Sequence, residues 1–197
     1  MLAPRKKLWS TPNEVISHVI QTIALHPEDT VCDIGCGDGN VLLRWAEAYS
    51  SSYAGEGKGE ANQTQMMPTF IGIDIAEERI ENAIRELDNY RRQGKILTRI
   101  NVSFHCANAL EASHLFQNAN IFFLYLIPRG LRIMRPILEK HLETMESPCR
   151  ASRSRVITYM APLEETEPEQ VFKVAVPHQP GASWPLYYYR IGRKCTT

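Results

Sequence analysis

The chain has 197 residues, 44% of them apolar, which is enough for one domain with a sizeable hydrophobic core. Its 22 Lys and Arg residues balance its 22 Asp and Glu residues, so the overall charge gives no reason to expect nucleic-acid binding. The longest apolar run, residues 121–127, is too short to span a bilayer, and no signal-peptide pattern follows Met1.

The first predicted element is a helix that begins at Thr11-Pro12-Asn13-Glu14. A Thr at the cap position, a Pro at the first helical position and an acid in the first turn predict a capping box with Thr11 as the cap. The apolar residues that follow repeat at helical spacing and form one face: Val15, Ile16, Val19, Ile20 and Ile23. His18 lies outside this stripe, so we expect it at the surface, and His26-Pro27 ends the helix.

Residues 31–40, Val-Cys-Asp-Ile-Gly-Cys-Gly-Asp-Gly-Asn, predict a buried strand that turns sharply into a helix. The apolar run ends in Asp33 and breaks into three alternating glycines, and a helical apolar pattern starts at Val41. Glycines allow the backbone to bend and a ligand to lie directly against it, while the N-terminus of the next helix offers free N–H groups and a partial positive charge. This turn is therefore the first candidate for a binding site.

The rest of the chain alternates between strand and helix patterns. Residues 50–69 have no apolar period and predict a long loop or an insertion. Strands are predicted at 70–75, 101–106, 121–127 and 155–160. A helix is expected at 77–92, closed by Arg91-Arg92 and Gly94, and a second helix follows Pro128, with a kink or a restart at Pro136.

Two further strands, 171–176 and 186–191, are joined by the Pro- and Gly-containing residues 177–185, which suits an antiparallel hairpin. The whole pattern predicts one α/β domain over residues 1–197. Its sheet should be doubly wound, mostly parallel and seven-stranded, with an antiparallel last strand.

Polar side chains follow the first four strands of this sheet: Asp33, Asp74, Asn108 and Tyr125. In a doubly wound sheet a ligand binds across the C-terminal ends of the strands, beside the point where the strand order reverses, so these residues should meet. An acid at the end of the second strand suits a diol, because a carboxylate accepts two hydroxyl donors.

The spacing of the glycines distinguishes two cofactor classes. A dinucleotide site with the pattern G-x-G-x-x-G would place its third glycine where this chain has Asn40. The string Asp33-Ile-Gly-Cys-Gly-Asp-Gly39 resembles instead the first motif of the seven-stranded methyltransferases that use S-adenosyl-L-methionine (AdoMet). This resemblance implies AdoMet as the cofactor, with Asp74 on its ribose and Ile75 packed on its adenine.

The same resemblance implies the remaining cofactor contacts. Many relatives have Asp where this chain has Asn108, but the amide keeps an oxygen that can accept the adenine amino group. Ala109 would offer a backbone N–H to the adenine ring. The residues expected to bind AdoMet are Thr11, Asp33, Gly35, Cys36, Gly37, Gly39, Asn40, Asp74, Ile75, Asn108 and Ala109.

Further segments narrow the resemblance to a family of small protein-lysine methyltransferases. These segments are Leu8 to Val15, Leu124-Tyr-Leu-Ile-Pro128, Arg135-Pro-Ile-Leu138, Arg155-Val-Ile157 and Trp184-Pro185. The family includes bacterial proteins and the mitochondrial enzymes that methylate the ATP synthase c-subunit and the adenine nucleotide translocase, and the resemblance covers most of the chain outside residues 50–69. It implies a protein lysine as the methyl acceptor and a protein as the partner.

Tyr125 is the candidate catalytic residue, expected to orient the acceptor amine beside the methyl group. Methyltransferases of planar amino groups usually carry Asn/Asp-Pro-Pro-Tyr/Phe after the fourth strand, and this chain has Leu-Tyr-Leu-Ile-Pro there, which argues against base methylation. Two alternatives stay open. One is a small-molecule methyltransferase, and the other is a non-catalytic AdoMet-binding partner subunit with the Tyr187-Tyr188-Tyr189 strand as its contact surface.

Five cysteines, an odd number without the spacing of a disulfide framework, indicate a reducing compartment. Cys32 and Cys36 lack a nearby Cys or His pair that would complete a zinc site, so no metal is expected. The hydrophobic N-terminal segment of the mitochondrial relatives has no counterpart here. We therefore expect an intracellular protein, in the cytoplasm, with the mitochondrion as the alternative location.

Overall fold

The computed structural model describes residues 10–55, 66–145, 147–175 and 181–191. Its helices are α1 (Asn13–Thr22), α2 (Asn40–Gly55), α3 (Glu77–Arg92), α4 (Pro128–Glu143) and α5 (Pro148–Ser152), with a 3-10 helix η1 (Ser113–Phe116). Its strands are β1 (Thr30–Ile34), β2 (Thr69–Asp74), β3 (Asn101–Cys106), β4 (Ile121–Leu124), β5 (Arg155–Tyr159), β6 (Gln170–Ala175) and β7 (Ser183–Tyr189). No helix in these ranges is both long and apolar enough to cross a membrane.

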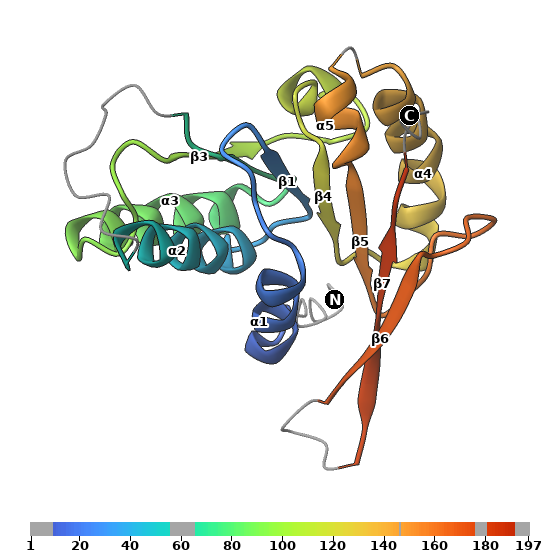
Figure 1. The fold of residues 1–197 in the computed structure, drawn as a ribbon, viewed down its shortest axis with the longest axis horizontal. Coiled ribbons are helices and arrows are strands. Elements are labelled where there is room, and N and C mark those ends of the chain that lie inside the picture. Colours follow the sequence, from blue (N-terminus) through green and yellow to red (C-terminus); the bar gives the residue numbers. More distant parts are fainter. Residues whose placement is uncertain (1–9, 56–65, 146, 176–180, 192–197) are drawn as a thin grey trace, which may run out of the picture.

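The seven strands form one sheet in the order β3-β2-β1-β4-β5-β7-β6 (Figure 1). β1 pairs in parallel with β2 on one side and β4 on the other, so the chain reverses its direction of winding at β1. β7 is antiparallel to both β5 and β6, which confirms the predicted hairpin and the antiparallel last strand. The doubly wound, mostly parallel sheet expected from the sequence is therefore the observed fold.

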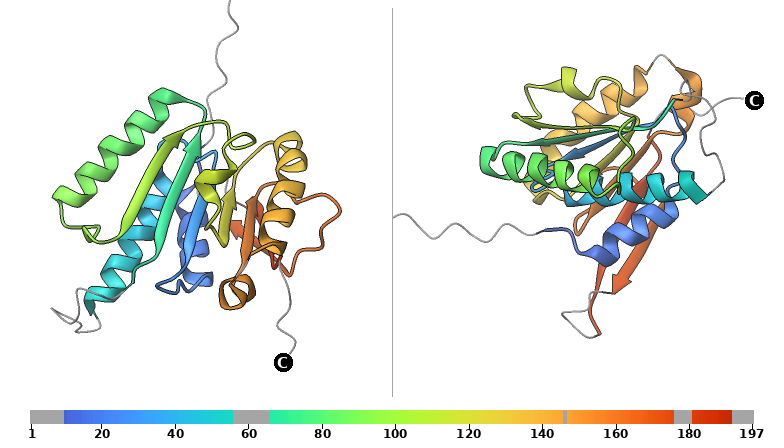
Figure 2. Two further views of the ribbon diagram at one scale, coloured as in Figure 1. Left: turned by 90° about the horizontal axis from the view of Figure 1, so that it is seen from above. Right: turned by 90° about the vertical axis from the view of Figure 1, so that its left-hand side faces the viewer.

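Helices cover both faces of the sheet, and each face has its own apolar core (Figures 1 and 2). On one face, α1, α2 and α3 pack around Trp45 and the strand residues Phe70 and Phe123. On the other face, α4 packs on Phe122 and Val156. Every residue of β1 and β4 is buried, as expected for central strands covered on both sides.

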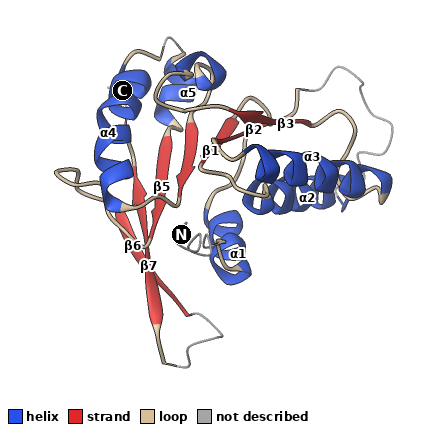
Figure 3. Cartoon of the chain, turned by 180° about the vertical axis from the view of Figure 1, so that it is seen from behind, coloured by secondary structure: helices blue, strands red, loops and turns tan. Residues whose placement is uncertain are grey.

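The β6–β7 hairpin extends beyond the helices at one end of the molecule (Figure 3). The residues that join the two strands were predicted at 177–185, but β7 already begins at Ser183, and residues 176–180 lie outside the described part of the chain. β6 contacts α1, where the ring of Phe172 lies 4.6 Å from the ring of His18. His18 is thus half-buried, and its expected surface position was wrong, because the helix pattern alone does not reveal that the distant hairpin packs there.

The capping box predicted at the start of α1 is not formed. Pro12 occupies the cap position in an extended conformation, and no side chain caps the helix. The carbonyl of Pro12 accepts the N–H of Ile16, so the helix starts one residue later than predicted. Thr11 is therefore not the helix cap, although it remains near the candidate site.

The boundaries of the predicted loop 50–69 also differ. α2 continues through residues 50–55, where serine hydroxyls bond to helix carbonyls one turn back: Ser50 to Ala46, Ser51 to Glu47 and Ser52 to Tyr49. Because these residues are mostly polar, they show no apolar period that would predict this part of the helix. At the other end β2 already begins at Thr69, and residues 56–65 lie outside the described ranges.

β4 ends at Leu124, three residues before the predicted end of the strand at Ile127. Leu124 pairs with Ile34 of β1, and β1 then bends away at Gly35, so residues 125–127 have no strand to pair with on that side. α4 starts at Pro128 and runs as one helix that includes Pro136, so the predicted restart does not occur.

Candidate functional site

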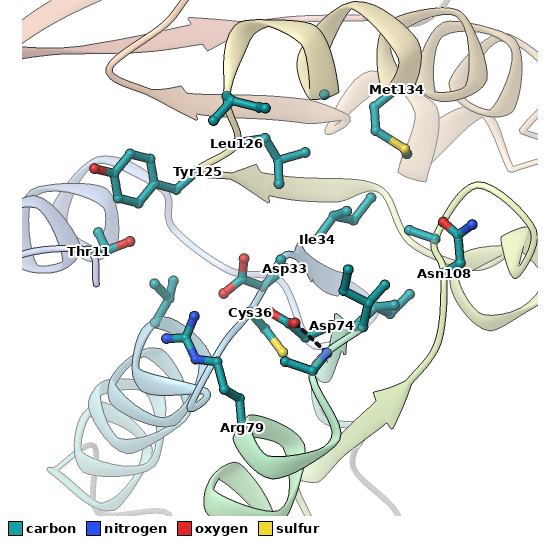
Figure 4. A pocket seen from close by; sticks show the side chains of 18 of the residues that line it. Thr11, Asp33, Ile34, Cys36, Asp74, Arg79, Asn108, Tyr125, Leu126 and Met134 are labelled. Atoms are coloured by element: carbon teal, nitrogen blue, oxygen red, sulfur yellow. Dashed lines mark hydrogen bonds between the residues drawn. The ribbon is translucent and has the colours of Figure 1, made fainter. Parts of the chain in front are cut away.

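A cavity of about 920 Å³ opens at the C-terminal ends of the parallel strands (Figure 4). Its walls come from the segments that follow β1, β2, β3, β4 and β5, together with Ser10 and Thr11 ahead of α1. Ten of the twelve predicted site residues line it: Thr11, Asp33, Gly35, Cys36, Asn40, Asp74, Ile75, Asn108, Ala109 and Tyr125. The other two, Gly37 and Gly39, shape the turn beneath it.

The three glycines of the turn all have positive φ angles, +83° at Gly35, +54° at Gly37 and +77° at Gly39. A side chain at these positions would also meet its neighbours: a Cβ on Gly35 would lie 2.8 Å from Leu126, and one on Gly39 would lie 2.6 Å from the Phe104 ring. Both the backbone conformation and the close packing therefore require glycine.

Most backbone N–H groups of this turn are already bonded within the protein. Gly35 and Cys36 both donate to the carbonyl of Ile73, and Gly39 donates to the carbonyl of Cys36. Gly37 donates to the Asp74 carboxylate at 2.9 Å. The turn is thus tied firmly to the end of β2, and few of its donors remain for a ligand.

Asp74 receives two backbone bonds, since the N–H of Ala76 donates to its second oxygen at 2.9 Å. A carboxylate has about four lone-pair sites, so each oxygen can still accept one hydroxyl. Asp74 is half-buried and lies at the cavity wall. Its geometry agrees with the diol interaction expected from the sequence.

Asp33 is only 2% exposed, and no donor in the described part of the chain bonds to its carboxylate. Burial and the nearby charge of Asp74 raise its pKa to about 8, while the Arg79 guanidinium opposes that rise. Asp33 is therefore an unpaired acid that faces the cavity and would ionise readily only beside a cation.

Two of the residues expected at the adenine, Ile75 and Asn108, are exposed. Ile75 is 77% exposed, which leaves a large apolar side chain uncovered at the cavity rim. Asn108 is exposed as well, and its amide is partly engaged: its oxygen accepts the N–H of Leu110 at 3.2 Å, and its nitrogen donates to Glu111 at 2.9 Å. These bonds fix the amide orientation and leave the oxygen one further lone pair.

Tyr125 lies at the end of the cavity nearest Thr11, away from Asn108 (Figure 4). Its ring packs 4.7 Å from the ring of Tyr159, and burial raises the pKa of its hydroxyl. The pKa of Tyr159 is raised to about 12 by burial and by the charges of Tyr125 and Glu14. Both phenols are neutral at physiological pH and can only donate or accept hydrogen bonds.

Arg79, a cavity residue that the sequence did not point to, lies in the first turn of α3. Its guanidinium covers Gly37 so closely that a Cβ there would lie 2.2 Å from Nη2. Its Nη2 and Nε donate to one oxygen of Asp38 at 3.0 and 3.3 Å. An Arg five residues after the strand-end acid is ordinary for an exposed helix, so no sequence signal separates it from the solvent-facing arginines of α3.

The Cys36 thiol is buried in the glycine turn, where burial and the charges of Asp33 and Asp74 hold its pKa well above the usual range. It is therefore a protonated packing group at neutral pH. Within the described ranges, no three His, Cys, Asp or Glu side chains gather closely enough to hold a metal ion.

A family model described as a methyltransferase domain matches residues 25–159, a range that includes the ends of β1 to β4. The chain belongs to this family. It is an AdoMet-dependent methyltransferase, which confirms the enzyme class and the cofactor predicted from the glycine spacing.

This methyltransferase is also similar to individual proteins. It is 22% identical over 182 residues to a protein-lysine N-methyltransferase of Saccharolobus islandicus (strain REY15A), covering 92% of this chain and 91% of the relative. Among solved structures, it resembles an RNA methyltransferase from Salinibacter ruber in complex with S-adenosyl-L-homocysteine, with a TM-score of 0.65, 19% identity and coverage of 94% and 95%. It also resembles a precorrin-6y C5,15-methyltransferase from Geobacter metallireducens, with a TM-score of 0.59, 16% identity and coverage of 94% and 90%. These structures share the fold of the methyltransferase.

Proposed function

We propose that this methyltransferase transfers the methyl group of AdoMet to the ε-amino group of a lysine in a protein. Two kinds of support point to this acceptor. The first is the chemistry of the cavity wall after β4, and the second is the lysine methyltransferase from Saccharolobus islandicus, which is similar over most of both chains.

The cofactor would lie along the cavity, with adenosine toward Asn108 and the amino-acid end toward Thr11. Asp74 would accept the ribose hydroxyls, and the uncovered Ile75 would pack on adenine. The free lone pair of Asn108 and the N–H of Ala109 would meet the adenine edge.

The turn and its surroundings would hold the other end of the cofactor. Gly35, Gly37 and Gly39 would let it approach the backbone, with Cys36 and Asn40 beside them. Asp33 would receive the ammonium group, since it is a buried acid to which no described residue donates, and Thr11 would line the far wall. The residues present thus fit AdoMet along the whole length of the cavity.

The observation that carries the lysine proposal is the wall formed by Tyr125, Leu126, Ile127 and Pro128. It contains one phenol and otherwise apolar side chains, and Ile127 is 71% exposed at the rim. No carboxylate or carboxamide stands in these four positions to grip a planar amino group. A long aliphatic stem with a terminal amine suits this wall.

When bound, AdoMet would supply a methyl group on a sulfonium: the amine lone pair would attack the methyl carbon in line, the S–CH₃ bond would break, and the thioether S-adenosyl-L-homocysteine would leave. The protein's contribution is positioning, which can supply on the order of 7 kcal/mol. Tyr125 would orient the neutral amine through its hydroxyl, while Leu126 and Met134 would exclude water from the cavity. Because a free lysine has a pKa of about 10.4, loss of its proton should limit the rate at neutral pH.

The test uses AdoMet with an isotopically labelled methyl group and extract from cells that lack the enzyme, so that acceptor sites are unmethylated. Labelled protein is hydrolysed, and we expect the label in methyl-lysine. The Asp74→Ala variant should give no label, because it removes the ribose interaction. Label found in RNA or in small molecules would contradict the lysine acceptor, and binding without any turnover would favour a partner-subunit role.

A further inference from the structure

Arg79 is the one Lys or Arg side chain that lines the cavity in the described part of the chain. It is 19% exposed, and its guanidinium lies toward the Asp33 and Thr11 end of the cavity, away from Asn108 (Figure 4). Its charge also lowers the pKa of Asp33 against the effect of burial, which indicates that the two groups are near each other. This end of the cavity therefore presents one acid and one cation.

The guanidinium is held in place but retains free donors. A guanidinium has five N–H donors in a planar fork. Asp38 occupies the side formed by Nε and Nη2 through a single oxygen, and Asn82 holds the other Asp38 oxygen at 3.2 Å. No described residue bonds to the end of the fork, formed by Nη1 and the second hydrogen of Nη2, which suits a bidentate bond to a carboxylate.

Four backbone donors of the glycine turn are already engaged. A glycine turn before a helix commonly binds anions through its N–H groups. In this chain the N–H groups of Gly35, Cys36 and Gly39 bond to backbone carbonyls, and that of Gly37 bonds to Asp74. Arg79 therefore adds a charged side-chain donor at this end, beside the unbonded N–H groups at the start of α2.

We propose that Arg79 binds the α-carboxylate of the cofactor while Asp33 binds its ammonium, so that the enzyme selects ligands with a complete amino-acid end. The adenosine part carries neither charge, and a zwitterion complements an acid and a cation placed together. This assignment rests on the proposed orientation of AdoMet in the cavity. It makes Arg79 a determinant of cofactor specificity.

Calorimetric titration of two ligands tests this role. S-adenosyl-L-homocysteine carries both charges, and S-adenosyl-3-thiopropylamine keeps the ammonium but lacks the carboxylate. In the Arg79→Met variant we expect the dissociation constant for S-adenosyl-L-homocysteine to rise roughly 10- to 100-fold, as for loss of a charge-assisted bidentate bond. The constant for the decarboxylated ligand should change less than about threefold.

Two further variants provide the controls. Arg79→Lys keeps the charge but not the planar fork of donors. The ratio of its two dissociation constants should therefore lie between the ratios of the wild type and of Arg79→Met. Arg92→Met makes the same charge change at the exposed far end of α3, and it should leave both constants unchanged. The thermal unfolding midpoint of each variant is measured alongside, and if Arg79→Met does not fold, Arg79→Lys decides the result.

Equal weakening of both ligands in the Arg79 variants would overturn the proposal, because Arg79 would then only support the turn through Asp38 and Gly37. No change for either ligand would overturn it as well. A wild-type protein that fails to bind S-adenosyl-L-homocysteine would instead contradict the proposed cofactor site. The two failures are therefore distinguishable.

Discussion

At the scale of single residues, the buried acid Asp33 makes stability depend on pH. Its pKa of about 8 in the folded protein lies above the ordinary Asp value of about 3.9. Between these values the folded state holds a proton that the unfolded state has lost, so the free energy of unfolding falls as pH rises, by up to about 1.4 kcal/mol per pH unit, and the fall ends above pH 8.

The Asp33→Asn variant should lack this contribution. We expect it to unfold at higher urea concentration than the wild type at pH 8, and to differ less from it at pH 5. Urea unfolding of both proteins at pH 5, 6, 7 and 8 isolates the effect, because all other groups cancel in the difference. If the difference in unfolding free energy between the two proteins is the same at every pH, Asp33 is ionised in the folded protein over this range.

Tyr125 is the residue whose removal should affect turnover alone. The Tyr125→Phe variant keeps the ring that packs on Tyr159 and loses only the hydroxyl. We expect kcat to fall about tenfold, as for one lost hydrogen bond to the acceptor, with the dissociation constant for S-adenosyl-L-homocysteine unchanged. Unchanged turnover would leave Tyr125 as a packing residue at the end of β4.

At the scale of elements, the glycine turn between β1 and α2 combines two constraints that can be separated. Gly39 and Gly94 both have positive φ angles, +77° and +67°, but only Gly39 has close neighbours, whereas nothing lies within 4 Å of a Cβ on Gly94. The Gly94→Ala variant should therefore lower the free energy of unfolding by about 1 kcal/mol, which is the cost of an alanine at a positive φ angle. Gly39→Ala should also displace the Phe104 ring, so the free energy of unfolding should fall by about 3 kcal/mol in total.

Urea unfolding of the two alanine variants measures this difference. Similar losses in both would mean that Phe104 moves away at little cost and that backbone conformation alone selects glycine. Gly94 also closes α3, where its N–H bonds to the carbonyl of Arg91, as the sequence predicts. Gly94→Ala thus serves as the matched control for conformation without crowding.

At the scale of the whole molecule, a polar network fastens the end of the sheet opposite the cavity. Asp29, 1% exposed, accepts the N–H of His26 at 2.8 Å, the Asn120 amide at 2.9 Å and Nε of Arg153 at 3.1 Å. His26 is a local partner, whereas Asn120 lies just before β4 and Arg153 just after α5, both far from Asp29 in the sequence. The network therefore joins both halves of the fold.

Asp29→Ala should destabilise the protein by about 3 kcal/mol, since it leaves buried donors without a partner. Glu28 pairs with the same Arg153 but is 44% exposed, so Glu28→Gln should cost less than about 1 kcal/mol. Neither change should alter the dissociation constant for S-adenosyl-L-homocysteine. A shift in that constant for Asp29→Ala would show that the two ends of the sheet are coupled.

Most of the fold could be predicted because apolar periodicity records which faces are buried. The strands that carry Asp33 and Asp74 were predicted within one residue, and the antiparallel hairpin was predicted correctly, although its second strand begins three residues earlier than expected. The errors have local physical causes. Serine hydroxyls extend α2 past the apolar pattern, and Pro12 displaces Thr11 from the helix cap.

The site residues that directly follow strands could be predicted, since a parallel sheet brings the C-terminal ends of its strands together. The site could not be predicted where a helix side chain reaches the cavity through tertiary packing. Arg79 and Met134 are such residues, as both line the cavity from helices whose sequence patterns resemble any amphipathic helix. Their placement depends on how α3 and α4 dock on the sheet.

The reversal of winding at β1 divides the cavity between two separate stretches of sequence. Residues 33–110 supply the wall that we assign to AdoMet, while residues 125–161 supply the opposing wall. Replacing the second stretch by that of a homologue with another acceptor should retarget methylation and spare cofactor affinity. In this architecture, the residues that contact the methyl acceptor can change during evolution while the residues that bind AdoMet stay the same.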